Sequence, residues 1–226
     1  MALSEAFEHS CIVELVNDSL YPYELRRVVV DDFYSDPDQI RRFALAARYC
    51  RSRDETIWRS RVKLFSKNAK ERLARCWGRN ISHHQWHNEF NGTFFIACAQ
   101  GRYKATPFIH FDTPTTFITV IVFLTPGRCE DSGTTFYLHR RTRLAGAPGT
   151  RTLRRMNATL ADFEETISRD SRRKAAWDVL DQVPYKFNRA IFFPAGLFHS
   201  ASRNFGATLN DGRLWQSFHF GLKRES

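Results

Sequence analysis

The hydrophobic pattern changes character along the chain, from helix-like spacing before about residue 90 to strand-like runs after it. Asp36 followed by Pro37 predicts a helix start, because aspartate caps helix N-termini and proline fits the first turn. This helix is expected to run to about Tyr49, and a second one over Asn68–Trp77. From about Gly92, runs rich in Phe, Ile, Val, Thr and Tyr predict strands. These runs are Thr93–Ala99, Tyr103–Phe111, Thr116–Leu124, Thr134–Leu138, Arg189–Phe193 and Arg213–Leu222.

Two further segments interrupt the strands. His139–Arg155 is rich in arginine and glycine and is expected to form a long basic loop, and Leu160–Gln182 is expected to be a helical insert. The order of elements predicts a single α+β domain over residues 1–226, whose core is a β-sandwich or jelly roll. Residues 1–90 would form a mainly helical part, and residues 91–226 the core, with the insert at 139–183.

Composition narrows the class of protein. A hydrophobic content of 42%, with 20 Phe and 5 Trp, excludes wholesale disorder. The net charge of +10 favours an anionic substrate or partner, but the charge is scattered, so a solvated surface is a simpler interpretation than a nucleic-acid-binding stripe. The 5 cysteines form no Cys-x-x-Cys pair and are expected to be reduced. With no apolar leader or membrane span in the pattern, we expect a cytoplasmic protein.

A candidate metal site begins at His110-Phe111-Asp112. Residues two apart in a strand point to the same side, so His110 and Asp112 can face one metal while Phe111 faces away. His199, after a second strand, could supply the third ligand. Two histidines and one carboxylate form the facial triad of non-haem Fe(II) sites. The alternative is a hydrogen-bonded core histidine, with Asp112 starting the turn that follows.

Arg213, at the start of the last predicted strand, adds a second feature. Fe(II) sites of this type commonly use 2-oxoglutarate, whose distal carboxylate needs a cation, and the arginine fork suits a carboxylate. Trp215, Ser217 and His219 follow at even offsets on the same face, and Ser217 could donate a hydrogen bond to the co-substrate or simply pack. Arg203 is a competitor for the role of Arg213, although it lies in a polar loop.

With these residues, the chain resembles the Fe(II)/2-oxoglutarate-dependent oxygenases of double-stranded β-helix (cupin-like) fold, and within them the domain of unknown function 6445. The matching stretches are Val30–Pro37, Phe108–Pro126, Gly133–Arg140, Phe187–Arg189, Leu197–Ser200 and Arg213–Leu214. The resemblance implies that His110, Asp112 and His199 bind iron and that Arg213 binds 2-oxoglutarate. A carboxylate at Asp112 favours hydroxylation over halogenation, since halogenating relatives usually carry a small residue there.

The expected activity is that of an oxidoreductase: an Fe(II)/2-oxoglutarate-dependent dioxygenase that uses O2, releases succinate and CO2, and hydroxylates a small metabolite. Substrate-side candidates are Trp86, His139 and Arg140, the last two in the basic loop, which would suit an anionic substrate. Three alternatives stay open. The substrate could be a residue of a peptide, protein or nucleic acid; the domain could be a non-catalytic module that binds anions or nucleic acid; or His83 and His87 could bind zinc, although a polar turn is the simpler interpretation there.

Overall fold

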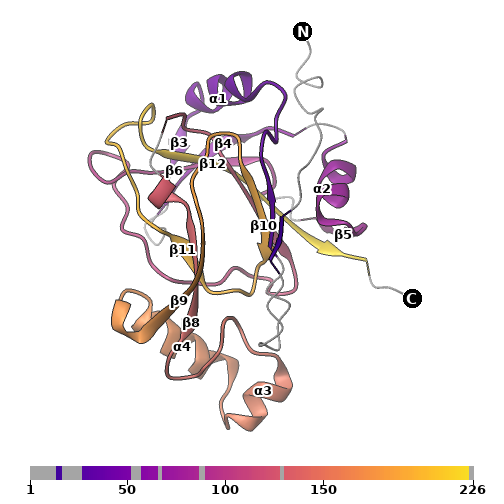
Figure 1. Ribbon diagram of the computed structural model, residues 1–226, viewed down its shortest axis with the longest axis vertical. Coiled ribbons are helices and arrows are strands. Elements are labelled where there is room, and N and C mark those ends of the chain that lie inside the picture. The colour runs from indigo at the N-terminus through magenta and orange to yellow at the C-terminus, as the bar shows by residue number, and fades with distance from the viewer. Residues whose placement is uncertain are drawn as a thin grey trace.

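Two antiparallel β-sheets form the centre of the protein. The computed structural model describes residues 14–16, 27–51, 57–65, 68–86, 90–127 and 130–223 (Figure 1). The larger sheet has the strand order β1-β2-β10-β7-β12-β6-β4-β3, with β5 paired to β12. Its strands are β1 (Glu14–Val16), β2 (Arg27–Val30), β3 (Tyr49–Cys50), β4 (Trp58–Lys63), β5 (Ile81–Trp86), β6 (Thr93–Ala97), β7 (Ile118–Phe123), β10 (Ala190–Pro194) and β12 (Arg213–Leu222). The smaller sheet has the order β11-β8-β9, formed by β8 (Thr134–His139), β9 (Trp177–Val183) and β11 (His199–Ala201).

Helices pack around these sheets. Figure 1 shows α1 and α2 beside the larger sheet, and α3 and α4 below β8 and β9. The helices are α1 (Pro37–Leu45), α2 (Ala69–Trp77), α3 (Thr150–Arg155) and α4 (Leu160–Asp170), with short 3-10 turns η2 (Glu130–Ser132) and η3 (Lys174–Ala176). The predicted cap of α1 is present, because the Asp36 carboxylate accepts a hydrogen bond from the Gln39 backbone N–H at 2.9 Å.

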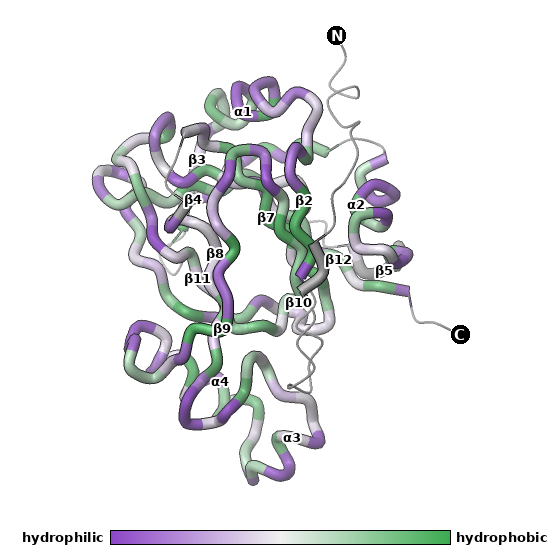
Figure 2. The backbone as a smooth tube through the Cα atoms, viewed as in Figure 1, coloured by the Kyte–Doolittle hydropathy of each residue, from purple (hydrophilic) through white to green (hydrophobic). Residues whose placement is uncertain are grey.

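The central strands have two different faces. On β12, Leu214, Phe218 and Phe220 pack in the core between the larger sheet and the N-terminal helices. Trp215, at an odd position, instead joins the core between the two sheets. The side chains of β7 and β10 are divided between the same two cores. Figure 2 shows hydrophobic residues along β2, β7 and β10. Alternate side chains of a strand point to opposite faces, so β12 must present Arg213, Ser217 and His219 to the space between the sheets.

Three predictions about elements were wrong in part. The described residues before 91 are not mainly helical, because strands β1–β5 accompany α1 and α2 and extend the sheet. The insert is helical over α4 and the short turn η3, but Trp177–Val183 forms β9 and pairs with β8 along its length. The expected strand Tyr103–Phe111 has only isolated bridges, at Lys104 and His110. Pro107 lies within this segment and has no backbone N–H to donate to a ladder.

Among the described residues, no helix combines the length and the apolar character that crossing a bilayer requires.

Candidate metal centre

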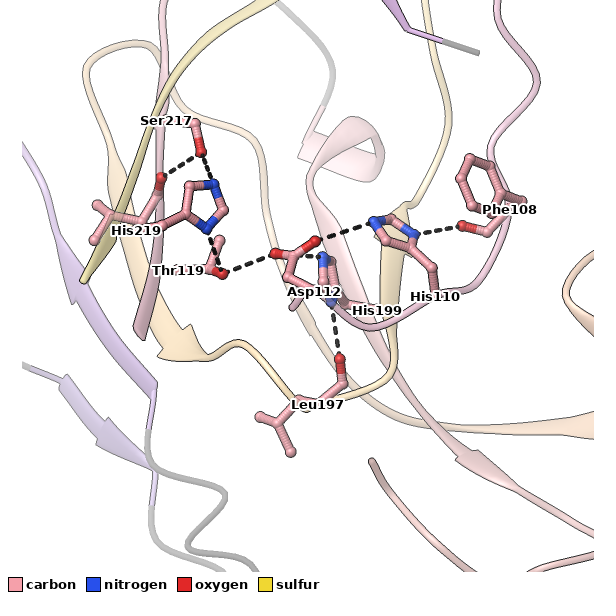
Figure 3. Close-up of polar contacts among 9 residues, drawn as sticks. Phe108, His110, Asp112, Thr119, Leu197, His199, Ser217 and His219 are labelled. Atoms are coloured by element: carbon pink, nitrogen blue, oxygen red, sulfur yellow. Dashed lines mark hydrogen bonds and ion pairs between the residues drawn. The ribbon is translucent and has the colours of Figure 1, made fainter. Parts of the chain in front are cut away.

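His110, Asp112 and His199 converge at one end of the space between the sheets. One ligand atom from each lies within 4.8 Å of the other two. The Asp112 carboxylate oxygens are 3.6 Å from His110 Nε2 and 3.7 Å from His199 Nε2 (Figure 3). The two histidine segments are held together by reciprocal backbone hydrogen bonds, of 3.1 Å from His110 N and 2.9 Å from His199 N. As predicted, Phe111 points away from this cluster and packs against Phe198.

Both imidazoles are oriented by the backbone. His110 Nδ1 lies 3.1 Å from the Phe108 carbonyl oxygen, and His199 Nδ1 lies 2.9 Å from that of Leu197. Each ring can therefore donate its Nδ1–H to a carbonyl and keep the Nε2 lone pair directed at Asp112, which is the usual arrangement of metal-binding histidines. Burial and the adjacent His110 together lower the pKa of His199 to about 4, against the opposing effect of Asp112, so His199 is neutral at pH 7.

A hydrogen-bonded chain supports the carboxylate. Thr119 Oγ1 donates to Asp112 Oδ2 at 2.7 Å and lies 3.2 Å from His219 Nδ1, and His219 Nε2 lies 2.9 Å from Ser217 Oγ (Figure 3). Thr119 and His219 are opposite each other in the β7–β12 register. Burial works against ionisation of Asp112, but the histidines and the Thr119 hydrogen bond outweigh it, so the pKa of Asp112 lies below its ordinary value.

Arg213 lines the same cavity of about 160 Å³ as the three candidate ligands. Its side chain is almost fully buried, with 3% of the residue exposed, and it lies between the rings of Phe123 and Trp215. Its hydrogen bonds are long contacts of 3.4 Å to the carbonyl oxygens of Ser132 and Gly133. Burial lowers the pKa of Arg213 to about 10, so the group is still charged at pH 7. Among the described residues no carboxylate lies within ion-pair distance of it, so the guanidinium is a buried charge that an anionic ligand would neutralise.

Comparison with known proteins identifies the family. The model of a family of unknown function, DUF6445, matches residues 20–215. The chain belongs to this family. No curated protein matches the DUF6445 chain in sequence.

Solved structures show the fold of the DUF6445 chain. HygX from Streptomyces hygroscopicus, with nickel and 2-oxoglutarate bound, is similar at a TM-score of 0.53 and 12% identity, over 87% of this chain and 83% of that one. SnoN, a non-haem α-ketoglutarate-dependent epimerase from nogalamycin biosynthesis, is similar at a TM-score of 0.52 and 17% identity, over 86% and 78%. The jelly-roll fold of the Fe(II)/2-oxoglutarate oxygenases, predicted from the sequence, is therefore confirmed for this family member.

The structure separates the two candidate arginines of the DUF6445 chain. The side chain of Arg203 is 53% exposed and pairs with Asp131 at 3.2 Å, and the residue does not line the cavity. Arg213 lies in the cavity because it occupies an inward position of a central strand. Ser217 also lines the cavity, but its hydroxyl already contacts the His219 ring and the Val120 carbonyl oxygen, the latter at 3.3 Å.

The three substrate-side candidates, Trp86, His139 and Arg140, do not line this cavity. Trp86 is buried in the core beside the N-terminal helices, because its strand β5 pairs with the outer end of β12. His139 is fully buried in a contact of 3.2 Å with Asp170. Arg140 is mainly exposed and pairs with Asp178 at 2.7 Å. The alternative of a zinc site would use the His83 side chain and His87, and both lie outside the described part of the chain.

Thr119 was missed by the sequence analysis. Its signal was a single polar residue in the otherwise apolar run Ile118–Phe123. A hydroxyl on a fully buried strand needs a hydrogen-bond partner, which is here the candidate ligand Asp112.

Proposed function

We propose that this protein is an Fe(II)/2-oxoglutarate-dependent dioxygenase that hydroxylates a small metabolite. The observation that carries the proposal is the presence, in one cavity, of three convergent metal-ligand side chains and a buried guanidinium that has no carboxylate partner among the described residues. A pre-oriented His-Asp-His set fits Fe(II), and a lone buried cation fits the distal carboxylate of 2-oxoglutarate.

The residues have separate roles in this proposal. His110, Asp112 and His199 would hold the metal through Nε2 and carboxylate atoms, with the backbone carbonyls and Thr119 maintaining their orientation. Arg213 would bind 2-oxoglutarate, and Ser217 would contact it from the same strand face. When bound, Fe(II) with 2-oxoglutarate and O2 supplies the oxidising chemistry, and succinate and CO2 are released.

Two further observations support a hydroxylase for small molecules. Asp112 provides a carboxylate where halogenation requires a vacant metal position. HygX, which shares the fold, has been solved with hygromycin B bound, at a TM-score of 0.51 and 11% identity, over 87% of this chain and 83% of that one. A bound small molecule therefore has a precedent within this architecture.

The test is anaerobic titration of Fe(II) and 2-oxoglutarate into the metal-free protein, following the metal-to-ligand charge-transfer band in the visible spectrum. We expect a band in wild type and none in His199→Ala. Arg213→Gln should need about 10- to 100-fold more 2-oxoglutarate, since a charge-assisted hydrogen-bonded contact contributes about 1.5–3 kcal/mol.

Arg203→Gln is the matched control, because it removes the same charge from the rival position. Its titration should overlay that of wild type. If folded wild type binds metal but forms no band at any 2-oxoglutarate concentration, the oxygenase proposal fails and a non-catalytic anion-binding module takes its place. Succinate formation that depends on a small molecule would count against a macromolecular substrate.

A further inference from the structure

A second cavity, of about 250 Å³, adjoins the candidate metal centre. It shares Pro107, Phe108, Ser200 and Ala201 with the cavity that holds the three ligands. Because these residues line both spaces, a molecule in the second cavity would contact residues that also line the cavity of the three ligands.

Phe108 links the two spaces directly. Its ring lies against that of His110, with centroids 4.7 Å apart, and its carbonyl oxygen accepts the His110 hydrogen bond. The Arg172 guanidinium lies over the same ring, 5.9 Å from its centroid. A single aromatic ring therefore separates a cation of the second cavity from a candidate metal ligand.

The cations of this cavity are available to a ligand. Arg172 and Lys174 both line it, and no carboxylate of the described residues lies within ion-pair distance of either. Nearby arginines, in contrast, have carboxylate partners: Arg173 pairs with Asp170 at 3.1 Å, and Arg140 pairs with Asp178 at 2.7 Å. The local acidic groups thus pair with other cations and leave these two for an anion.

The rest of the lining is suited to an apolar body. Tyr137 and Trp177 form an aromatic wall with ring centroids 6.2 Å apart. Val179, which also lines this cavity, is 65% exposed and adds apolar surface to it. Ser200 adds a hydroxyl, 3.2 Å from the Tyr137 hydroxyl, on the side nearest the metal centre.

We propose that this second cavity is the substrate subsite, and that the substrate is a small molecule with an apolar body and an anionic group, a carboxylate or a phosphate, bound by Arg172 and Lys174. The inference rests on the proposed oxygenase function and specifies its substrate class. Binding the anion at Arg172 would place the rest of the molecule along Phe108 toward the ligands. The predicted preference for an anionic substrate is retained, but the cations are not those of the predicted loop.

The test uses protein loaded with Mn(II) and 2-oxoglutarate, so that Arg213 is already occupied, and isothermal titration calorimetry with three probes. Phenyl phosphate and phenylacetate carry the two kinds of anion, and benzyl alcohol is the neutral comparison. We expect at least one anionic probe to bind about tenfold more tightly than benzyl alcohol. The double variant Arg172→Gln/Lys174→Gln should remove that difference. Arg154→Gln, an exposed cation that lines neither cavity, is the matched control and should bind like wild type.

The outcomes are distinguishable from failure of the oxygenase proposal. If the Fe(II)–2-oxoglutarate band forms in both wild type and the double variant, and only the double variant loses the anion preference, the subsite is supported. If the band forms but anions bind no better than benzyl alcohol, or equally well to the double variant, the subsite is overturned while the oxygenase stands. If the band is absent from wild type, the substrate role falls together with the oxygenase, whatever the probes do.

Discussion

Three hydrogen bonds orient the ligand side chains of the candidate centre, and each comes from a group that would not touch the metal. The Phe108 and Leu197 carbonyl groups belong to the backbone and cannot be removed by substitution. Thr119 is the side-chain member, and it is itself positioned by His219. Groups of this kind tune metal affinity by fixing the ligand geometry.

Thr119→Val should therefore weaken metal binding without removing a ligand. We expect Mn(II) affinity, measured by calorimetry, to fall about 10- to 100-fold, the usual effect of losing an outer hydrogen bond to a ligand. Thr119→Ser retains the hydroxyl and should stay close to wild type. Equal affinities for the valine variant and wild type would show that Asp112 keeps its position without Thr119.

Residue chemistry alone was sufficient to select the ligand candidates but not the substrate residues. His-x-Asp and a distant histidine are unusual enough in type and spacing to be selected, and the structure brings them together. Arg140 and Arg172 look alike in the sequence, and only the positions of their acidic neighbours separate a paired cation from an available one.

At the scale of elements, the ends of β2 and β10 are joined by an ion-pair cluster that the strand patterns did not reveal. Asp31, directly after β2, contacts Arg189 Nε at 2.6 Å and Lys186 Nζ at 2.9 Å, both just before β10. The hydrogen bond from Arg189 is the main effect that lowers the pKa of Asp31 from 3.8 to about 2, against partial burial. The cluster therefore stabilises the β2–β10 pairing while Asp31 is ionised.

Asp31→Asn should lower the free energy of unfolding at pH 7 by about 1 kcal/mol, a modest figure because the cluster is partly solvated. Since the folded pKa lies below the unfolded one, this contribution is complete above pH 3.8 and is lost as the pH falls toward 2. Urea denaturation of both proteins at a series of pH values should show the difference shrinking in that window. A difference that does not change with pH would contradict an electrostatic origin.

Elements with a clear hydrophobic pattern were predicted well. Elements whose conformation depends on pairing with a distant strand were not. The limits of β12 coincide with the predicted Arg213–Leu222, a run rich in aromatic residues and without proline. Trp177–Val183 carries two aspartates and follows a helix, so it was assigned to the helical insert. It is a strand because the exposed edge of β8 accepts it as a partner.

At the scale of the whole molecule, the candidate centre joins parts of the chain that are distant in sequence. Asp112 N donates to the Ala195 carbonyl at 2.8 Å, and the His110 and His199 backbones pair directly. A metal bound by these side chains would further connect the same two segments. It would do so only in the folded state, because the ligands are brought together by folding.

Metal should therefore stabilise the fold. At a free Mn(II) concentration of about 100 Kd, the gain is about 2.7 kcal/mol, or a rise of roughly 5–10 °C in Tm for a chain of this size. Differential scanning fluorimetry should show this rise, its reversal by chelator, and its absence in His199→Ala. An equal rise in His199→Ala would place the metal elsewhere.

Local periodicity and side-chain chemistry were sufficient to predict the residue types of the centre, the apolar faces of the central strands, the first helix cap and hence the class of fold. Three properties could not be predicted in this way: which arginine lies buried beside the ligands, that Thr119 donates a hydrogen bond to Asp112, and that Arg172 and Lys174 border the second cavity without acidic partners among the described residues. Those properties depend on distances between segments that are far apart in the chain, and these distances are set by sheet pairing and packing.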